Sequence, residues 1–214
     1  MKTTFRSFAL AFCAAALSIG PLGCGHDDDG GGGGGEIGED KDRNLVACIG
    51  DSITQGYACE GAPYPSRLAG YSGKTVLNYG VGGTTASYGA SVVGSALARN
   101  PAYVCILFGA NDCIGGVSAE TTVGNLRRIV QACKESKTRP IVATPTPMVA
   151  PHSGYTERLE RLRDGIRAMA KEEGVSCVDL YGAFGSGEGL LNSDGLHMTD
   201  AGSDLIAKKF NSRL

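Results

Sequence analysis

Two short segments of the sequence carry the residue types of a nucleophilic hydrolase. An apolar run over 45–50 leads into a Gly-Asp-Ser segment that ends at Ser52, and Asp194 and His197 follow late in the chain. A serine hydroxyl is a weak nucleophile until a base within hydrogen-bond reach takes its proton and a third group orients that base. The three-residue spacing of Asp194 and His197 lets carboxylate and imidazole meet within one turn. We therefore expect a catalytic triad of Ser52, His197 and Asp194.

The small number of histidines narrows the choice of base. The chain has three, and His26 stands in a Gly/Asp-rich stretch near the N-terminus. His152 follows a proline with no acid close in sequence, whereas His197 has Asp194 beside it. His197 is thus the better candidate. The alternative interpretation is that Asp194 only caps a turn and His197 is an ordinary surface residue.

Two further segments could stabilise the negative charge that develops on an ester oxygen. A glycine-rich turn containing Gly83 follows the apolar run 75–79, and Asn111 follows the run 102–108. Backbone N–H groups and a side-chain amide are suitable oxyanion donors. Each segment alone is most simply a turn. A nucleotide site is not indicated, because the glycine fingerprint is missing from the first strand's turn.

The order of apolar runs predicts an α/β fold. Short β-rich runs alternate with helix-like stretches, which is typical of parallel strands joined by crossover helices. Polar residues that follow such strands meet at one edge of the sheet, where ligands bind. The expected strands are 45–50, 75–79, 102–108, 140–144 and 175–180, and the expected helices run from Ser118 through Cys133, over 155–173 with a stop at Gly174, and over 199–213.

The N-terminus has the layout of an export signal. Lys2 and Arg6 precede an apolar stretch over 8–19, which is shorter than the roughly 20 residues of a membrane span. Gly23 and Cys24 then resemble the lipidation site of bacterial lipoproteins, and ordinary cleavage nearby is the alternative. We expect an exported, lipid-anchored protein in the periplasm or at the cell surface.

The amino-acid composition divides the chain into three segments. Residues 1–23 form the predicted signal peptide, 24–43 a flexible Gly/Asp-rich tether, and 44–214 one domain. Lys2 and Arg6 leave with the signal, so 18 of 20 basic residues remain against 22 acidic ones. This excess of acid argues against a nucleic-acid partner.

Six cysteines fall within the predicted domain. None has the short spacing of a zinc site or a redox dithiol, so we expect no metal. Cys48, Cys105 and Cys177 lie in apolar runs and are expected in the core. Cys59 and Cys113 each lie shortly beyond a motif that should end at the same rim. In an oxidising compartment we expect these two to form a disulfide.

Taken together, residues 44–214 resemble the SGNH hydrolases of the GDSL esterase and lipase group. Any one block is a short pattern, but four in the right order at strand ends are specific. The common α/β-hydrolase family is disfavoured because Gly-x-Ser-x-Gly is absent. The blocks are Gly50-Asp51-Ser52, Val81-Gly82-Gly83-Thr84, Gly109-Ala110-Asn111-Asp112 and Asp194-Gly195-Leu196-His197.

The resemblance implies a flavodoxin-like three-layer α/β/α sandwich with a five-stranded parallel sheet. It also implies roles: Ser52 as nucleophile, His197 as base and acid, and Asp194 as its partner. The oxyanion would be held by the N–H groups of Ser52 and Gly83 and by the Asn111 amide, with Gly83 chosen over Gly82 by alignment.

The resulting prediction is a cofactor-independent, monomeric ester hydrolase. Its compact domain favours short acyl groups on a polar alcohol, such as O-acetyl groups of a carbohydrate. A thioesterase, a lysophospholipase, an acyltransferase with the same triad and a non-enzymatic glycan-binding module remain alternatives. A further alternative is a glycosidase in which Asp51 and Asp194 form the acid/base pair, although Ser52, His197 and Asn111 would then lack roles.

Overall fold

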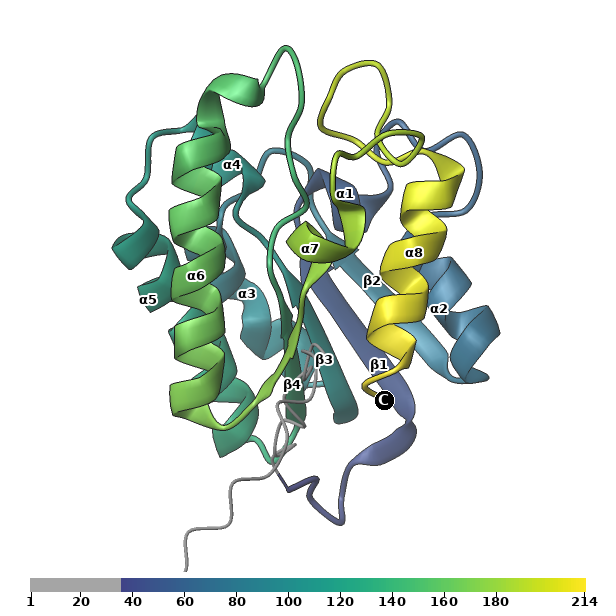
Figure 1. Cartoon of the computed structure of the whole chain (residues 1–214). Coiled ribbons are helices and arrows are strands. Elements are labelled where there is room, and N and C mark those ends of the chain that lie inside the picture. The colour runs from purple at the N-terminus through teal and green to yellow at the C-terminus, as the bar shows by residue number, and fades with distance from the viewer. Residues whose placement is uncertain (1–35) are drawn as a thin grey trace, which may run out of the picture. The chain divides into compact units, whose positions relative to one another are not determined.

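The computed structural model describes residues 36–214, which build a five-stranded, fully parallel sheet between two layers of helices (Figure 1). The strand order is β2-β1-β3-β4-β5. This confirms the predicted three-layer α/β/α fold. The strands are β1 (Asp42–Gly50), β2 (Thr75–Gly80), β3 (Pro101–Leu107), β4 (Arg139–Ala143) and β5 (Ser176–Val178).

The helices cover the two faces of the sheet separately. On one face α3 packs on α5 and α5 packs on α6, and on the other face α2 packs on α8 (Figure 1). The short helices α1 and α4 directly follow strands β1 and β3. The helices are α1 (Ser52–Gln55), α2 (Tyr64–Ser72), α3 (Ala86–Leu97), α4 (Ala110–Ile114), α5 (Ala119–Glu135), α6 (Thr156–Glu173), α7 (Leu180–Phe184) and α8 (Asp200–Asn211), with a 3₁₀ turn η1 (Ser153–Tyr155).

Side-chain alternation along the central strand explains why two cores form. Successive side chains of a strand point to opposite faces of its sheet. In β1, Ala47 and Ile49 therefore join the core under α3, α5 and α6, whereas Val46 and Cys48 join the core under α2, α7 and α8. Burial on both faces is the reason why parallel strands read as continuous apolar runs.

Local capping signals fix the ends of the long helices. The Ser118 side chain accepts a hydrogen bond from the Thr121 N–H and caps α5, and Thr199 caps α8 in the same way. Helix α6 ends at Gly174, whose φ of 66° is the left-handed conformation that glycine adopts readily. All three expected helices are thus confirmed to within two residues.

The folded domain begins earlier than predicted. Ile37 is only 7% exposed and belongs to the core under α2, α7 and α8. The Gly38 N–H donates to the Lys137 carbonyl, and the Lys41 ammonium donates to Asn100. The tether prediction is therefore wrong for its last residues, because Ile37 has an apolar contact to gain. The predicted signal, Cys24 and the tether up to residue 35 lie outside the described residues.

Within residues 36–214, no helix is both long and apolar enough to cross a membrane.

Candidate active site

The nucleophile candidate stands at the junction of β1 and α1. Gly50 ends the strand where a Cβ would lie 2.0 Å from the Thr54 Oγ1 and 2.5 Å from the Leu107 carbonyl oxygen, so only glycine fits. Asp51 then caps α1 by accepting a hydrogen bond from the Ile53 N–H at 2.9 Å. Ser52 is the first residue of the helix, and its hydroxyl lies at the carboxyl edge of the sheet.

The structure brings the three predicted triad residues into one hydrogen-bonded chain. The His197 Nε2 lies 2.9 Å from the Ser52 Oγ, and the His197 Nδ1 lies 2.7 Å from the Asp194 Oδ2. These distances are within normal hydrogen-bond range. The arrangement has the nucleophile, base and orienting acid in the order that acyl transfer needs.

Charge decides which histidine nitrogen carries the proton. Burial raises the pKa of Asp194, but hydrogen bonds from the N–H groups of His197 and Leu196 and from the imidazole outweigh burial and leave the pKa below its ordinary value. An ionised carboxylate can only accept, so the His197 Nδ1 is the donor. The His197 Nε2 is then free to accept the hydrogen bond that the Ser52 hydroxyl donates.

A tight turn holds Asp194 and His197 together. The Asp194 Oδ1 accepts from the N–H groups of Leu196 and His197, both at 2.9 Å. Gly195 has a φ of 72°, and a Cβ there would lie 2.4 Å from the Ala150 carbonyl oxygen. The proline-rich loop after β4 therefore packs directly against the turn. It also donates a hydrogen bond from the Val149 N–H to the Gly195 carbonyl, which helps to hold the turn in place.

The predicted oxyanion donors Gly83 and Asn111 follow β2 and β3, the two strands that flank β1. Asn111 is the second residue of α4. Its Nδ2 donates a hydrogen bond at 2.9 Å to the carbonyl of Thr84, the residue that follows Gly83. The amide carries a second hydrogen that this bond does not use. Within residues 36–214, the Ser52 and Gly83 N–H groups donate to no protein acceptor. The segments after β1, β2 and β3 thus each offer an N–H donor of the chemistry that an oxyanion needs.

The structure does not distinguish Gly82 from Gly83 as the oxyanion donor of this loop. Gly83 has a φ of 74°, and a Cβ there would meet nothing within 4 Å. A Cβ on Gly82 would lie 2.8 Å from the Gln55 Oε1 and 3.9 Å from the Ser52 Cβ. Gly82 therefore lets the loop pass close to α1, whereas Gly83 provides the positive φ of the turn.

Asp112 is a positioning residue that the sequence analysis did not single out. Both of its carboxylate oxygens accept from the Ala86 N–H, at 3.1 and 3.3 Å, and one also accepts from the Thr122 hydroxyl. It therefore ties the start of α3, just after the glycine loop, to α4 and α5. Burial raises the pKa of this carboxyl, and its hydrogen bonds oppose the rise.

Asp51 is buried beneath the site and does not face substrate. Burial raises its pKa to about 7, with the Ile53 hydrogen bond opposing the rise and the nearby charge of Asp112 adding to it. Its Oδ2 has no hydrogen-bond partner within residues 36–214. The glycosidase alternative fails on this geometry, because one of its two acids is enclosed and Asp194 is bound to His197.

The remaining histidine candidate is elsewhere. His152 stacks on Tyr155 beside η1, with ring centroids 6.2 Å apart. His197, by contrast, is the histidine that contacts Ser52. No three His, Cys, Asp or Glu side chains of residues 36–214 gather as a metal site would require.

The predicted disulfide is wrong. Cys59 and Cys113 are both free, and they belong to opposite faces of the sheet. The Cys59 Sγ lies 3.3 Å from the Ser203 hydroxyl on α8, whereas Cys113 is buried in the core under α3, α5 and α6. Burial raises the pKa of the Cys113 thiol to about 11. The two strand ends share a rim, but α1 and α4 leave that rim in opposite directions.

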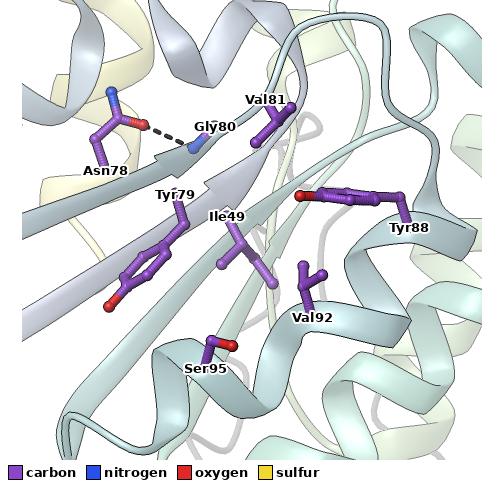
Figure 2. Close-up of a pocket in the computed structure, with 8 residues that line it drawn as sticks. All are labelled: Ile49, Asn78, Tyr79, Gly80, Val81, Tyr88, Val92 and Ser95. Carbon is purple, nitrogen blue, oxygen red and sulfur yellow. Dashed lines mark hydrogen bonds between the residues drawn. The ribbon is translucent and has the colours of Figure 1, made fainter.

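A hollow of about 340 Å³ lies beside the site, between β2 and α3 (Figure 2). Ile49 and Val92 contribute aliphatic surface, and Tyr79 and Tyr88 flank it. Val81 joins its rim to the glycine loop, so the hollow adjoins the oxyanion donors without including the triad. Its lining residues carry no charge.

Comparisons with known proteins agree with this geometry. The model of the GDSL-like lipase/acylhydrolase family matches residues 48–205. No curated protein matches the chain in a sequence search.

Solved structures share the fold. A putative lipolytic protein of the G-D-S-L family from Desulfitobacterium hafniense is 24% identical, with a TM-score of 0.67 over 80% of this chain and 100% of that one. A lipase/acylhydrolase from Enterococcus faecalis is 24% identical, with a TM-score of 0.70 over 79% and 94%. A catalytic mutant of an acetylxylan esterase from Geobacillus stearothermophilus is 20% identical, with a TM-score of 0.70 over 81% and 94%. The chain therefore belongs to the GDSL-like lipase/acylhydrolase family and is an ester hydrolase.

Proposed function

We propose that the protein hydrolyses short-chain acyl esters of a carbohydrate through a covalent acyl-enzyme formed on Ser52. The single observation that carries this proposal is the continuous chain from the Ser52 Oγ to the His197 Nε2 at 2.9 Å and from the His197 Nδ1 to Asp194 at 2.7 Å. A serine held in this way has the base that it needs for attack on a carbonyl carbon.

The first half-reaction forms the acyl-enzyme. The Ser52 Oγ bonds to the ester carbonyl carbon while its proton passes to the His197 Nε2. The carbonyl oxygen becomes negative and lies against the N–H groups of Ser52 and Gly83 and the Asn111 amide. When the tetrahedral intermediate collapses, the bond to the alkoxide breaks and the His197 Nε2–H protonates that leaving oxygen.

The second half-reaction releases the acid. A water molecule gives a proton to the His197 Nε2 as its oxygen attacks the acyl carbon. Collapse of the second intermediate breaks the bond to the Ser52 Oγ, which regains the proton from His197. Asp194 stays ionised throughout and stabilises the imidazolium, in accord with its lowered pKa.

Two kinds of support favour short acyl groups on a sugar. The domain is compact, and its sequence has no long apolar segment suited to cover a lipid chain. Among proteins with this fold are acetylxylan and acetyl-xylooligosaccharide esterases, and histidine-to-alanine and aspartate-to-alanine variants of one of them are described as catalytic mutants. The same two residue types orient and protonate in our proposal.

Labelling with an organophosphonate tests the nucleophile. The wild-type protein should be labelled at Ser52, and the Ser52→Ala variant should not react. Ser66→Ala, which removes an exposed hydroxyl on α2, is the matched control and should label like the wild type. Absence of labelling in folded wild type would contradict the proposal and favour a glycan-binding module.

An ester series tests the substrate class. Esters of one alcohol with acyl chains from acetate to palmitate should show the highest kcat/KM for acetate. The kcat/KM for acetylated oligosaccharides should exceed that for simple acetates and for acetyl thioesters. Faster hydrolysis of long acyl chains would overturn the short-chain assignment while leaving the nucleophile in place.

A further inference from the structure

An exposed aromatic ring lies directly against the triad histidine. Tyr57 follows α1 and is 61% exposed, yet its ring centroid is only 4.7 Å from that of His197, at an interplanar angle of 60°. A separation of this size is typical of interacting aromatic rings. One part of the tyrosine ring thus contacts the base, and most of its surface remains open to solvent.

Backbone hydrogen bonds fix the segment that carries the Tyr57 ring relative to both Ser52 and His197. The Tyr57 N–H donates to the Ser52 carbonyl at 2.9 Å. The Asn192 side chain donates to the Ala58 carbonyl, and the Asn192 N–H donates to the His197 carbonyl, both at 2.8 Å. Tyr57 is therefore tied to the nucleophile on one side and to the histidine turn on the other.

The residue after Tyr57 is conformationally strained. Ala58 has a φ of 58°, which an L-amino acid with a Cβ adopts at a cost of about 1 kcal/mol. Such strain persists only where surrounding contacts hold it, and the hydrogen bond from Asn192 is one of them. The main chain thus turns sharply just after Tyr57, and the Asn192 hydrogen bond holds it in that turn.

Tyr71, another exposed tyrosine, has a structural explanation that differs from that of Tyr57. Tyr71, at 45% exposure, donates a hydrogen bond to Asp204 on α8, and its ring lies 5.7 Å from the Lys208 Nζ. Its role is to join α2 to α8. Tyr57 contacts His197 instead, and the rest of its ring is open to solvent beside the Ser52–His197 pair.

Reaction geometry decides which part of the substrate meets Tyr57. The leaving oxygen must come within hydrogen-bond reach of the His197 Nε2, because that atom protonates it. The alcohol half of the ester therefore lies beside the His197 ring and the tyrosine packed on it. The face of an aromatic ring carries negative charge, which attracts the slightly positive C–H groups on the flat face of a sugar ring. An acyclic alcohol presents no such face.

Resting on the proposed function, we propose that Tyr57 is a fixed platform on which the ring of the alcohol half stacks, so that the site selects esters of cyclic sugars over esters of acyclic alcohols. Tyr57 binds substrate and takes no proton. Its contribution should appear in KM for a ring-containing substrate, because the contact is made equally in the bound substrate and in the transition state.

Kinetics with two acetates that differ only in the alcohol half test the proposal. One is an acetylated methyl pyranoside, and the other is 2-hydroxyethyl acetate. Tyr57→Ala should raise KM for the pyranoside about tenfold with kcat within about threefold of wild type. For 2-hydroxyethyl acetate, kcat/KM should fall by less than about threefold. Tyr57→Phe, which keeps the aromatic face, should behave as wild type on both.

Tyr71→Ala is the matched control for loss of an exposed tyrosine and should leave the ratio of the two kcat/KM values unchanged. Phosphonate labelling of each variant reports whether the triad is intact independently of the sugar. Equal losses on both acetates would mean that Tyr57 acts through His197, and no loss on the pyranoside would mean no stacking; either result overturns the platform. A wild type that hydrolyses no ester would instead refute the proposed function.

Discussion

The two ring nitrogens of His197 contact different residues, Asp194 and Ser52. Asp194 is three residues away and fixes the imidazole through the Nδ1, whereas Ser52 is 145 residues away and meets the Nε2. The lowered pKa of Asp194 keeps the carboxylate ionised at neutral pH, so the proton on the Nδ1 is stable. The direction of proton transfer is therefore set by charge before substrate binds.

Asn111 provides a test of oxyanion stabilisation. Asn111→Ala removes the amide beside Gly83, and we expect kcat to fall by about 10²–10³ with KM changed much less, because the bond is strongest in the transition state. The phosphonate should still label Ser52, since the triad remains. Steady-state kinetics on an acetate ester measure the effect. A variant with wild-type kcat would remove Asn111 from the oxyanion site.

Asp51 predicts a pH dependence of stability. Its folded pKa of about 7 exceeds its unfolded value of 3.8, so the folded state binds the extra proton between these values. Its stabilising effect is present at low pH and is lost as pH rises toward and through 7. Asp51→Asn keeps the oxygen that accepts from Ile53 and cannot ionise. We expect the variant to gain about 2–3 kcal/mol relative to wild type on going from pH 5 to pH 8.

Urea unfolding at the two pH values measures this difference. Glu39→Ala, at an exposed position, is the control and should show the same pH dependence as wild type. Parallel stability curves for Asp51→Asn and wild type would show that the Asp51 carboxyl is not held neutral in the folded protein.

At the scale of elements, the end of β2 packs so closely against α1 that only glycine fits there. A Cβ on Gly80, at the end of β2, would lie 2.1 Å from the Gln55 N and 2.5 Å from the Thr54 carbonyl carbon. Both are backbone atoms of α1, so neither can move without moving the helix. The same helix begins with Ser52, and the fit of β2 against α1 therefore positions the nucleophile.

Gly80→Ala should consequently destabilise the protein by about 3 kcal/mol and lower kcat, because overpacking against backbone cannot be relieved by a rotamer change. Gly70→Ala is the matched control in α2, where a Cβ meets nothing within 4 Å. It should raise stability by about 0.5–1 kcal/mol. Thermal unfolding with activity assays distinguishes the two, and a Gly80→Ala variant as stable as wild type would contradict the close packing.

At the scale of the whole molecule, the parallel sheet gathers the functional residues at one edge. Ser52 follows β1, the Gly83 loop follows β2, and Asn111 follows β3. These strands are neighbours in the order β2-β1-β3, with β1 in the centre. Ser52 therefore follows the strand between those that precede Gly83 and Asn111, and His197 reaches it from the segment before α8.

The domain boundary makes a prediction at this scale. Ile37→Ala in the full chain should reduce the free energy of unfolding by about 2 kcal/mol, because the side chain is buried in the core under α2, α7 and α8. Glu39→Ala, two residues away and exposed, should change it by less than about 0.5 kcal/mol. Equal, negligible effects in urea unfolding would return residues 37–43 to the flexible tether.

Much of the architecture could be predicted because its signals are local. Apolar runs identify buried strands, and residues such as Ser118 and Gly174 mark helix ends through hydrogen bonds and backbone conformations that involve only nearby residues. The pairing of Asp194 with His197 could be anticipated for the same reason, since a three-residue turn brings them together. The element order, the fold class and the contact of Asp194 with His197 could therefore be predicted from the sequence.

Only the tertiary structure decided how distant segments meet. Cys59 and Cys113 follow motifs at the same rim, yet they pack on opposite faces of the sheet. The contact of the Tyr57 ring with His197 and the burial of Ile37 have no local signal either. Such contacts depend on the direction in which each segment leaves its strand and on what else occupies that face, and these are properties of the packed chain that no sequence period encodes.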